Sequence, residues 1–161
     1  MKHFFRITIL IAATMLLYGC TGNTDPGALS VAGLENYEFT MVQGNKPESG
    51  KPLVIEFWAT WCGPCHRLFP HLNELTEDLK ETDIQFVAVT NEPFNLTKEF
   101  VTVRKLKYPI ASDIQDIYGR ALNVTYIPFA VIVNSAGEIV WSGHSGKLSR
   151  KRIENVLAPK I

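Results

Sequence analysis

Cysteine is scarce in this chain: three occur among 161 residues, at positions 20, 62 and 65. A structural zinc site takes four ligands, most often two pairs of Cys or His residues, and no second pair accompanies Cys62 and Cys65. His66 adjoins Cys65 but projects elsewhere around a helix, and His71 and His144 are isolated. We therefore expect no metal and no cofactor, although half of a zinc site remains an alternative interpretation of the cysteine spacing.

The chain also lacks net charge, because 16 basic residues balance 16 acidic ones. Proteins that bind nucleic acid through electrostatics carry a basic excess, so we expect no nucleic-acid partner. The apolar run Ile7–Leu17 is shorter than the roughly 20 residues that a transmembrane helix needs. Lys2 and Arg6 give it the positive flank of a targeting signal instead.

The apolar run ends in Leu17-Tyr18-Gly19-Cys20, which resembles a bacterial lipobox. This resemblance implies that residues 1–19 are a lipoprotein signal peptide and that the Cys20 thiol carries diacylglycerol, which anchors the protein to a membrane. An ordinary signal peptide followed by a stray cysteine is the alternative. Lipidation of Cys20 leaves no unpaired thiol in an oxidising compartment.

Cleavage after residue 19 removes two positive charges and leaves a net charge of about −2. Residues 20–36 are rich in small and polar residues, which predicts a flexible tether. Residues 37–161 are enough for one domain with one core. We expect this domain to act as a monomer.

The spacing of Cys62 and Cys65 predicts redox chemistry. The pair follows a strand-like apolar run, Leu53–Trp58, and precedes a helical pattern, so Cys62 should lie at a helix N-terminus, where free N–H groups and the helix dipole favour an anion. A fall of the thiol pKa from about 8.5 to about 7 would raise the thiolate fraction at pH 7 from roughly 3% to about 50%. Cys65, one turn further on, is close enough to close a disulfide. The pair is therefore predicted to exchange thiols and disulfides, with a purely structural disulfide as the alternative.

The stretch Glu56-Phe-Trp-Ala-Thr-Trp-Cys-Gly-Pro-Cys65 resembles the active site of thioredoxins. It resembles more closely the exported TlpA/ResA-like thiol–disulfide oxidoreductases, in which Phe-Trp-Ala-Thr-Trp-Cys recurs. The similarity runs from about Tyr37 to the C-terminus and includes Ile127-Pro128 and the hairpin turn 134–138. It implies a thioredoxin-like α/β fold, with a central mixed β-sheet and helices on both faces.

Hydrophobic periodicity predicts the same architecture. The helix after the cysteines should bury Leu68, Leu72, Leu75 and Leu79, and a second helix should turn Phe100, Val103 and Leu106 inward. A Gly-containing turn between the last two strands predicts an antiparallel hairpin. The expected strands are 37–42, 53–58, 84–90, 129–134 and 138–142, and the later helices are 96–106, 114–122 and 148–157.

Two further residues receive catalytic roles. By resemblance, Ile127-Pro128 is a cis peptide that offers backbone hydrogen bonds to an extended substrate; an ordinary trans proline at a strand start is the alternative. Glu56 is charged within an apolar strand, so burial should raise its pKa. We assign it as the proton acceptor for Cys65, with an outward-facing surface glutamate as the alternative. Many ResA-like proteins have an acid where this chain has Leu68.

The rim of the disulfide is expected to consist of Trp61, Gly63, Pro64 and Ile127, and Trp58 and Trp61 are expected to shield the disulfide. Pro64 suits the first turn of a helix, where its missing N–H costs little. The Gly-Pro dipeptide is that of reducing thioredoxins.

These features predict a thiol–disulfide oxidoreductase of the bacterial cell envelope, lipid-anchored and facing the periplasm or exterior, that acts mainly as a reductant. The resemblance implies exported substrates, such as apocytochrome c, and a membrane electron donor of the DsbD/CcdA type. The alternatives are a disulfide-forming oxidase, a Sco-like copper-delivery protein that uses His144, and a redox-inert scaffold. Sco-like proteins space their cysteines by three residues rather than two, and intact cysteines with Pro128 disfavour a scaffold.

Overall fold

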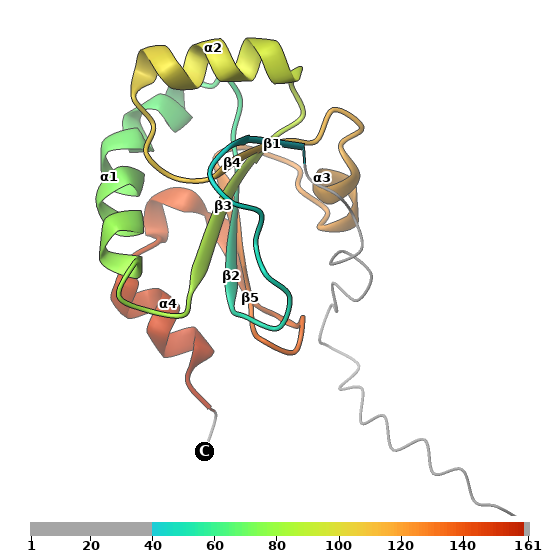
Figure 1. Ribbon diagram of the computed structural model, residues 1–161. Coiled ribbons are helices and arrows are strands. Elements are labelled where there is room, and N and C mark those ends of the chain that lie inside the picture. Colours follow the sequence, from blue (N-terminus) through green and yellow to red (C-terminus); the bar gives the residue numbers. More distant parts are fainter. Residues whose placement is uncertain (1–39, 160–161) are drawn as a thin grey trace, which may run out of the picture.

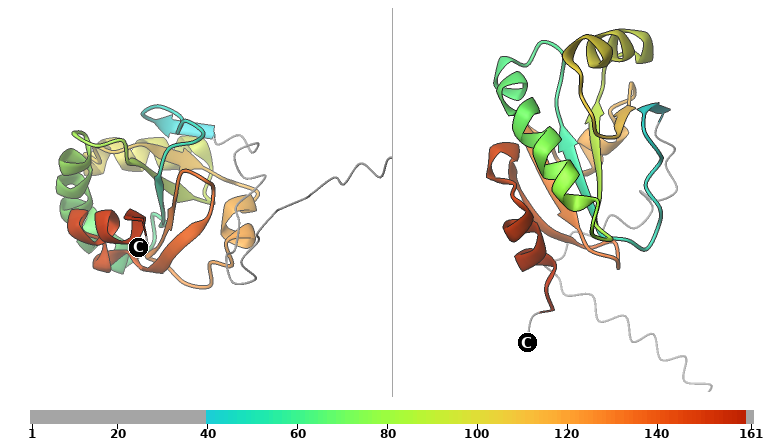
Figure 2. Two further views of the ribbon diagram at one scale, coloured as in Figure 1. Left: turned by 90° about the horizontal axis from the view of Figure 1, so that it is seen from below. Right: turned by 60° about the vertical axis from the view of Figure 1, so that its left-hand side comes forward.

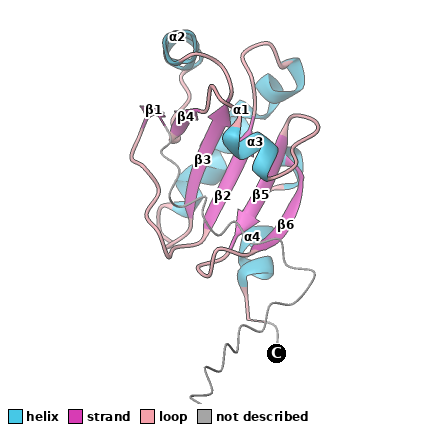
Figure 3. Cartoon of the chain, turned by 90° about the vertical axis from the view of Figure 1, so that its right-hand side faces the viewer, coloured by secondary structure: helices cyan, strands magenta, loops and turns pink. Residues whose placement is uncertain are grey.

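A six-stranded mixed sheet organises residues 40–159, the part of the chain that this computed structural model describes. The predicted signal peptide (1–19), Cys20 and the tether (20–36) lie outside the described residues. Figure 1 shows the described domain, and Figure 3 shows the strand order β1-β4-β3-β2-β5-β6 across the sheet. The strands are β1 (Thr40–Gln43), β2 (Leu53–Phe57), β3 (Gln85–Thr90), β4 (Ile110–Ser112), β5 (Phe129–Val133) and β6 (Ile139–His144).

Helices cover both faces of this sheet, which confirms the predicted thioredoxin-like α/β fold. Buried side chains of α1 and α4 pack on one face, and those of α3 pack on the other. Figure 3 shows α3 in front of the sheet, and Figure 2 shows α1 and α4 together on the opposite side. The helices are α1 (Gly63–Leu79), α2 (Phe94–Arg104), α3 (Ile117–Ala121) and α4 (Arg150–Leu157), with a 3₁₀ turn, η2 (Ser145–Lys147), before α4.

The central strand β2 determines where the cysteines lie. It pairs in parallel with β3 and antiparallel with β5. The α1 crossover between β2 and β3 places Cys62 just beyond the carboxyl end of β2, as predicted. Because β5 runs antiparallel to β2, the start of β5 lies at this same end, where Phe129 pairs with Phe57.

The buried face of α1 differs by one position from the prediction. Leu72, Leu75 and Leu79 are buried as expected, but Leu68 is only half-buried and Phe69 is buried instead. Cys65, Phe69 and Leu72 are spaced at i, i+4 and i+7, so the burial of Cys65 sets the face that the helix turns inward.

The inward face of α2 was predicted wrongly at Val103, whose exposed fraction is 72%. Thr97 and Val101 are the buried residues of this helix, and Phe100 packs against the core. Val103 follows Val101 by two positions, about 200° around the helix, and therefore faces outward. Leu106 is buried as expected, but it lies beyond the helix, which ends at Lys105 in a left-handed conformation.

The short strand β4 was not predicted. It has only three residues, too few to show a periodic pattern, yet all three are buried between β3 and β1. The helix expected over 114–122 is shorter, and Ile114, at its predicted start, is exposed. The antiparallel hairpin of β5 and β6 is confirmed.

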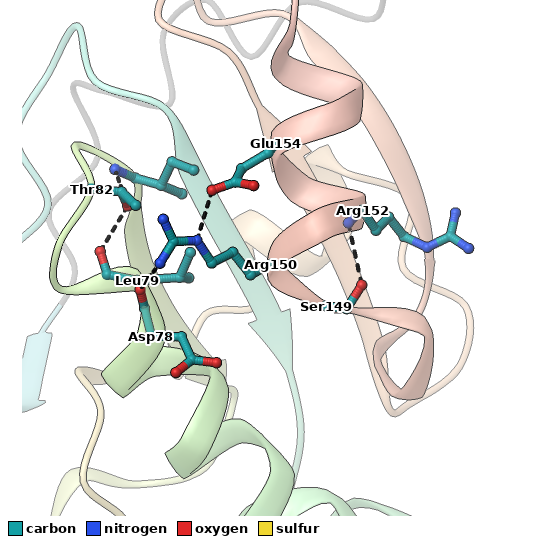
Figure 4. A network of polar contacts seen from close by, with 8 residues as sticks. Asp78, Leu79, Thr82, Ser149, Arg150, Arg152 and Glu154 are labelled. Carbon is teal, nitrogen blue, oxygen red and sulfur yellow. Dashed lines mark hydrogen bonds and ion pairs between the residues drawn. The ribbon is translucent and has the colours of Figure 1, made fainter.

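Polar contacts tie α4 to the end of α1 (Figure 4). The Arg150 guanidinium donates to the Asp78 carbonyl at 3.1 Å and pairs with Glu154 at 2.7 Å. Ser149 caps α4 by accepting the Arg152 N–H at 3.2 Å. Within residues 40–159, no helix combines the length and apolar character needed to cross a membrane.

Two substitutions test this packing. Leu72→Ala empties a buried position between α1 and the sheet and should lower the free energy of unfolding by about 2–5 kcal/mol. Val103→Ala removes an exposed side chain and should change it by about 0.5 kcal/mol or less. Urea denaturation of the oxidised protein measures both. Equal losses would contradict the assigned faces of α1 and α2.

Candidate active site

Cys62 and Cys65 form a disulfide at the N-terminus of α1, where the sequence predicted a redox pair. Cys62 is the N-cap residue: its Sγ accepts the Cys65 N–H at 3.2 Å. Its carbonyl accepts the N–H groups of Cys65 and His66 at 3.0 and 3.2 Å. Pro64 lies in the first turn, where an N–H has no partner within the helix. The Cys62 sulfur therefore lies at the N-terminus of α1, where it shares the N–H of Cys65 with its own carbonyl.

Of the four predicted rim residues, three are exposed and Ile127 is half-buried. Gly63 and Pro64 are exposed above the disulfide, and 73% of Trp61 is exposed. Both cysteines are buried. Trp58 is buried in the same core cluster as the cysteines and contacts the rings of Phe69 and Phe100 at centroid distances of 5.7 and 5.6 Å. The exposed residues next to the disulfide in the chain are therefore Trp61, Gly63 and Pro64.

Pro128 lies at the same end of the sheet as the disulfide. The Ile127–Pro128 peptide is cis, as the resemblance implied, and leads into β5, whose first residue pairs with the last residue of β2. Pro128 is buried and Ile127 half-buried. The carbonyl of Pro128 accepts the N–H of Ser145 at 3.4 Å. Tyr126, just before this pair, is half exposed and packs edge-on against Phe129.

Glu56 is buried inside the fold, which excludes the alternative of a surface glutamate: 1% of its surface is exposed. Its neighbours across the sheet are Ala88 on β3 and Ala130 on β5, which leave space above the strand for the longer side chain. Val54 and Trp58, two positions away on either side, belong to the core beneath α1, so period-two alternation directs Glu56 toward the same layer as Cys65.

The surroundings of Glu56 contain few groups that stabilise a charge. Oε1 accepts the Ser145 hydroxyl at 3.1 Å, and Oε2 has no hydrogen-bond partner among the described residues. Burial raises the pKa of Glu56 to about 8, and the Ser145 hydrogen bond opposes this rise. The buried Tyr108 also has a raised pKa, first because of burial and second because of the negative charge of Glu56. Glu56 can therefore gain or lose a proton near neutral pH.

The loop that carries Trp61 and Cys62 is held by residues that the sequence analysis did not identify. Glu92 accepts the N–H and the hydroxyl of Thr60, both at 2.6 Å. His66 bonds the Thr60 carbonyl through Nε2 at 2.8 Å. His66 was expected to project away from the site, but it turns back toward this loop. All three polar groups of Thr60 are thus bonded, so the loop has a defined position.

One signal in the sequence could have identified Glu92, but none could have identified Ser145. Glu92 follows β3, and parallel neighbours end at the same edge of a sheet, so topology places it near the residues after β2. Ser145 is 89 residues away from Glu56 in the sequence, and no spacing rule connects them.

The histidines of the described region contact the backbone. His71 bonds the Leu148 carbonyl at 2.9 Å, and His144 accepts the Gly146 N–H at 3.0 Å through Nδ1. Residues 40–159 contain no group of three or more His, Cys, Asp or Glu side chains placed to hold a metal ion.

The sequence matches a known protein family over most of its length. Residues 36–157 match the Redoxin family. The chain is 32% identical over 129 residues to the thiol–disulfide oxidoreductase ResA of Halalkalibacterium halodurans, covering 77% of this chain and 70% of the relative. It is 30% identical over 128 residues to ResA of Bacillus thuringiensis strain Al Hakam, covering 76% and 73%.

Solved structures share the fold. StoA from Bacillus subtilis aligns with a TM-score of 0.64 at 20% identity, covering 74% of this chain and 94% of that one. This likeness shows the thioredoxin-like fold alone. The evidence for the activity comes from the sequence relatives, which are named as thiol–disulfide oxidoreductases. The chain therefore belongs to the Redoxin family and is a ResA-like thiol–disulfide oxidoreductase with Cys62 and Cys65 as its cysteine pair.

Proposed function

We propose that this protein is anchored to a bacterial membrane through Cys20, faces the periplasm or exterior, and mainly reduces disulfides in exported proteins. The observation that carries the redox part of the proposal is the position of Cys62, whose sulfur caps α1 at the end of the central strand. The N-terminus of a helix stabilises a thiolate, which is the form of cysteine that attacks a disulfide.

The reaction has two steps. The Cys62 thiolate attacks one sulfur of a substrate disulfide, forms a mixed disulfide and releases the other substrate sulfur as a thiolate. Cys65 then gives its proton to the Glu56 carboxylate and attacks the Cys62 sulfur. This second attack releases the first substrate sulfur and closes the Cys62–Cys65 disulfide, so two electrons have passed to the substrate.

Substrate binding is assigned to the end of the sheet that carries the cysteines. Trp61, Gly63 and Pro64 form the exposed side of the disulfide, and the backbone of Ile127 and Pro128 is proposed to hydrogen-bond an extended substrate segment. Cysteine-containing exported proteins such as apocytochrome c are the proposed substrates. A membrane protein of the DsbD/CcdA type is the proposed electron donor that reduces the disulfide again.

Cysteine substitutions separate the two steps. Cys62→Ser should abolish both mixed-disulfide formation and turnover, because it removes the attacking sulfur. Cys65→Ser should still form the mixed disulfide and then fail to release it. Non-reducing electrophoresis and mass spectrometry of cells that express each variant measure the trapped complexes. The assigned roles would be reversed if Cys65→Ser captured nothing while alkylation showed Cys65 to be the accessible thiol.

Glu56→Gln should slow the second step about 10²- to 10⁴-fold, because it removes the proton acceptor, and leave the first step nearly unchanged. In the native protein, resolution should accelerate as the pH rises toward 8, where Glu56 ionises. Glu56→Gln should lose this inflection, whereas Glu74→Gln, which changes an exposed glutamate on α1, should keep it. Single-turnover kinetics across pH measure both steps. Equal resolution rates in Glu56→Gln and the native protein would assign the proton to water.

The same substitution should change the pH dependence of stability. The pKa of Glu56 is about 8 in the folded protein and near 4.5 when the side chain is exposed. Between these pH values, Glu56 binds fewer protons in the unfolded chain than in the folded protein. The contribution of Glu56 to the free energy of unfolding therefore falls as the pH rises from 4.5 to 8 and then levels off. Relative to the native protein, Glu56→Gln should gain on the order of a few kcal/mol across this window, measured by urea denaturation with the disulfide intact.

The proposed anchor rests on the segment Leu17–Cys20. The native protein should partition into detergent, whereas Cys20→Ala should lose the lipid and leave the membrane fraction. Mass spectrometry of the mature N-terminus measures the modification directly. An unmodified N-terminal residue in the native protein would exclude a lipid anchor without affecting the redox assignment.

A further inference from the structure

Ser145 is a fully buried hydroxyl residue at the start of η2, just after β6. It lies at the same end of the sheet as the disulfide, because the last residue of β6, His144, pairs with the first residue of β5, Phe129. A buried hydroxyl needs a hydrogen-bond partner to offset its loss of water. The partner of Ser145 is the Glu56 carboxyl group, at 3.1 Å.

Two hydrogen bonds hold the backbone of Ser145, one through its N–H and one through its carbonyl. Its N–H donates to the Pro128 carbonyl at 3.4 Å, and its carbonyl accepts the Leu148 N–H at 3.0 Å. These bonds position the residue independently of its side chain. The hydroxyl is therefore directed at Oε1 of Glu56 by the backbone that also contacts the cis-proline segment.

We propose that Ser145 is the positioning residue for proton transfer in this enzyme, because it connects the Pro128 segment, where substrate docks, to the carboxyl group of Glu56. Its hydroxyl orients Oε1, which leaves the partnerless Oε2 free to accept a proton, and its N–H holds the Pro128 carbonyl. Substrate that shifts the Pro128 backbone would therefore shift the hydrogen bond on Glu56. This inference rests on the role proposed above for Glu56.

The groups around Glu56 support this assignment. On α1, Cys65 is in the disulfide, the two histidines bond backbone carbonyls, and the other titratable side chains are exposed. The segment before β4 contributes Tyr108, which is buried. The charged residues of α4 are exposed. Within residues 40–159, Ser145 is thus the one neighbour found to favour the ionised form of Glu56.

Removal of this hydroxyl has a defined direction. A donor to a carboxylate stabilises the charged form, so Ser145→Ala should move the titration of Glu56 to higher pH. A hydrogen bond to a charged group corresponds to a shift of about one pH unit or more. Fewer Glu56 side chains would then be ionised near pH 8, and resolution there should slow about fivefold or more. Ser145→Ala should fold at neutral pH, because Glu56 is mostly protonated there and the backbone bonds of Ser145 remain.

The experiment follows the Glu56 carboxyl carbon by NMR titration of the oxidised full-length protein with ¹³C-labelled glutamate. The Glu56 signal is identified as the one missing from Glu56→Gln. Ser145→Ala should raise its titration midpoint, whereas Thr97→Val should not. The control deletes an equally buried hydroxyl that donates to the Pro93 carbonyl. An unchanged midpoint in Ser145→Ala would overturn the proposal.

Single-turnover kinetics supply the second measurement. Ser145→Ala should shift the pH profile of resolution in the native background and have no further effect in Glu56→Gln. An equal slowing in both backgrounds would overturn the proposal, since Ser145 would then act by another route. A different result would show that Glu56 is not the proton acceptor. In that case Glu56→Gln would leave the resolution rate unchanged, although Ser145→Ala still moved the titration of Glu56. Neither residue would then take part in proton transfer.

Discussion

The rest of the site depends on the burial of one carboxyl group in the middle of the sheet. Glu56 lies on the central strand between two alanines, with 1% of its surface exposed. No cation among the described residues pairs with this carboxyl group, so a charge there is costly and burial raises the pKa to about 8. This cost means that a buried glutamate destabilises a strand. The same cost brings the pKa of Glu56 into the range where thiols exchange protons.

The residues around the disulfide come from neighbouring strand ends. Thr60 follows β2 and is bonded by Glu92, which follows β3. Pro128 precedes β5 and is bonded by Ser145, which follows β6. Because these ends meet at one edge of the sheet, hydrogen bonds between them connect to both the cysteine loop and the cis-proline segment. The surrounding core supplies rigidity, and the polar contacts supply orientation.

This arrangement gives a physical reason why an acid on β2 suits the chain. Many ResA-like proteins carry an acid on the helix, where this chain has Leu68, and Leu68 is half-buried against the core. Apolar packing thus occupies the helical position, while Glu56 lies on the central strand in the core layer beneath α1. A carboxyl group there is more deeply buried than one at the half-buried position of Leu68, so desolvation raises its pKa further.

Local pattern in the sequence determined the features that depend on neighbouring residues. The strand before Cys62, the helix after it, the hairpin of β5 and β6 and the burial of Glu56 follow from periodicity and residue type. The tertiary structure decided the rest. Val103 faces outward because Val101 and Phe100 dock α2 on the core, and β4 forms only because β1 and β3 flank it. Ser145 reaches Glu56 across 89 residues, because the order of strands in the sheet, which no local period encodes, brings their ends together.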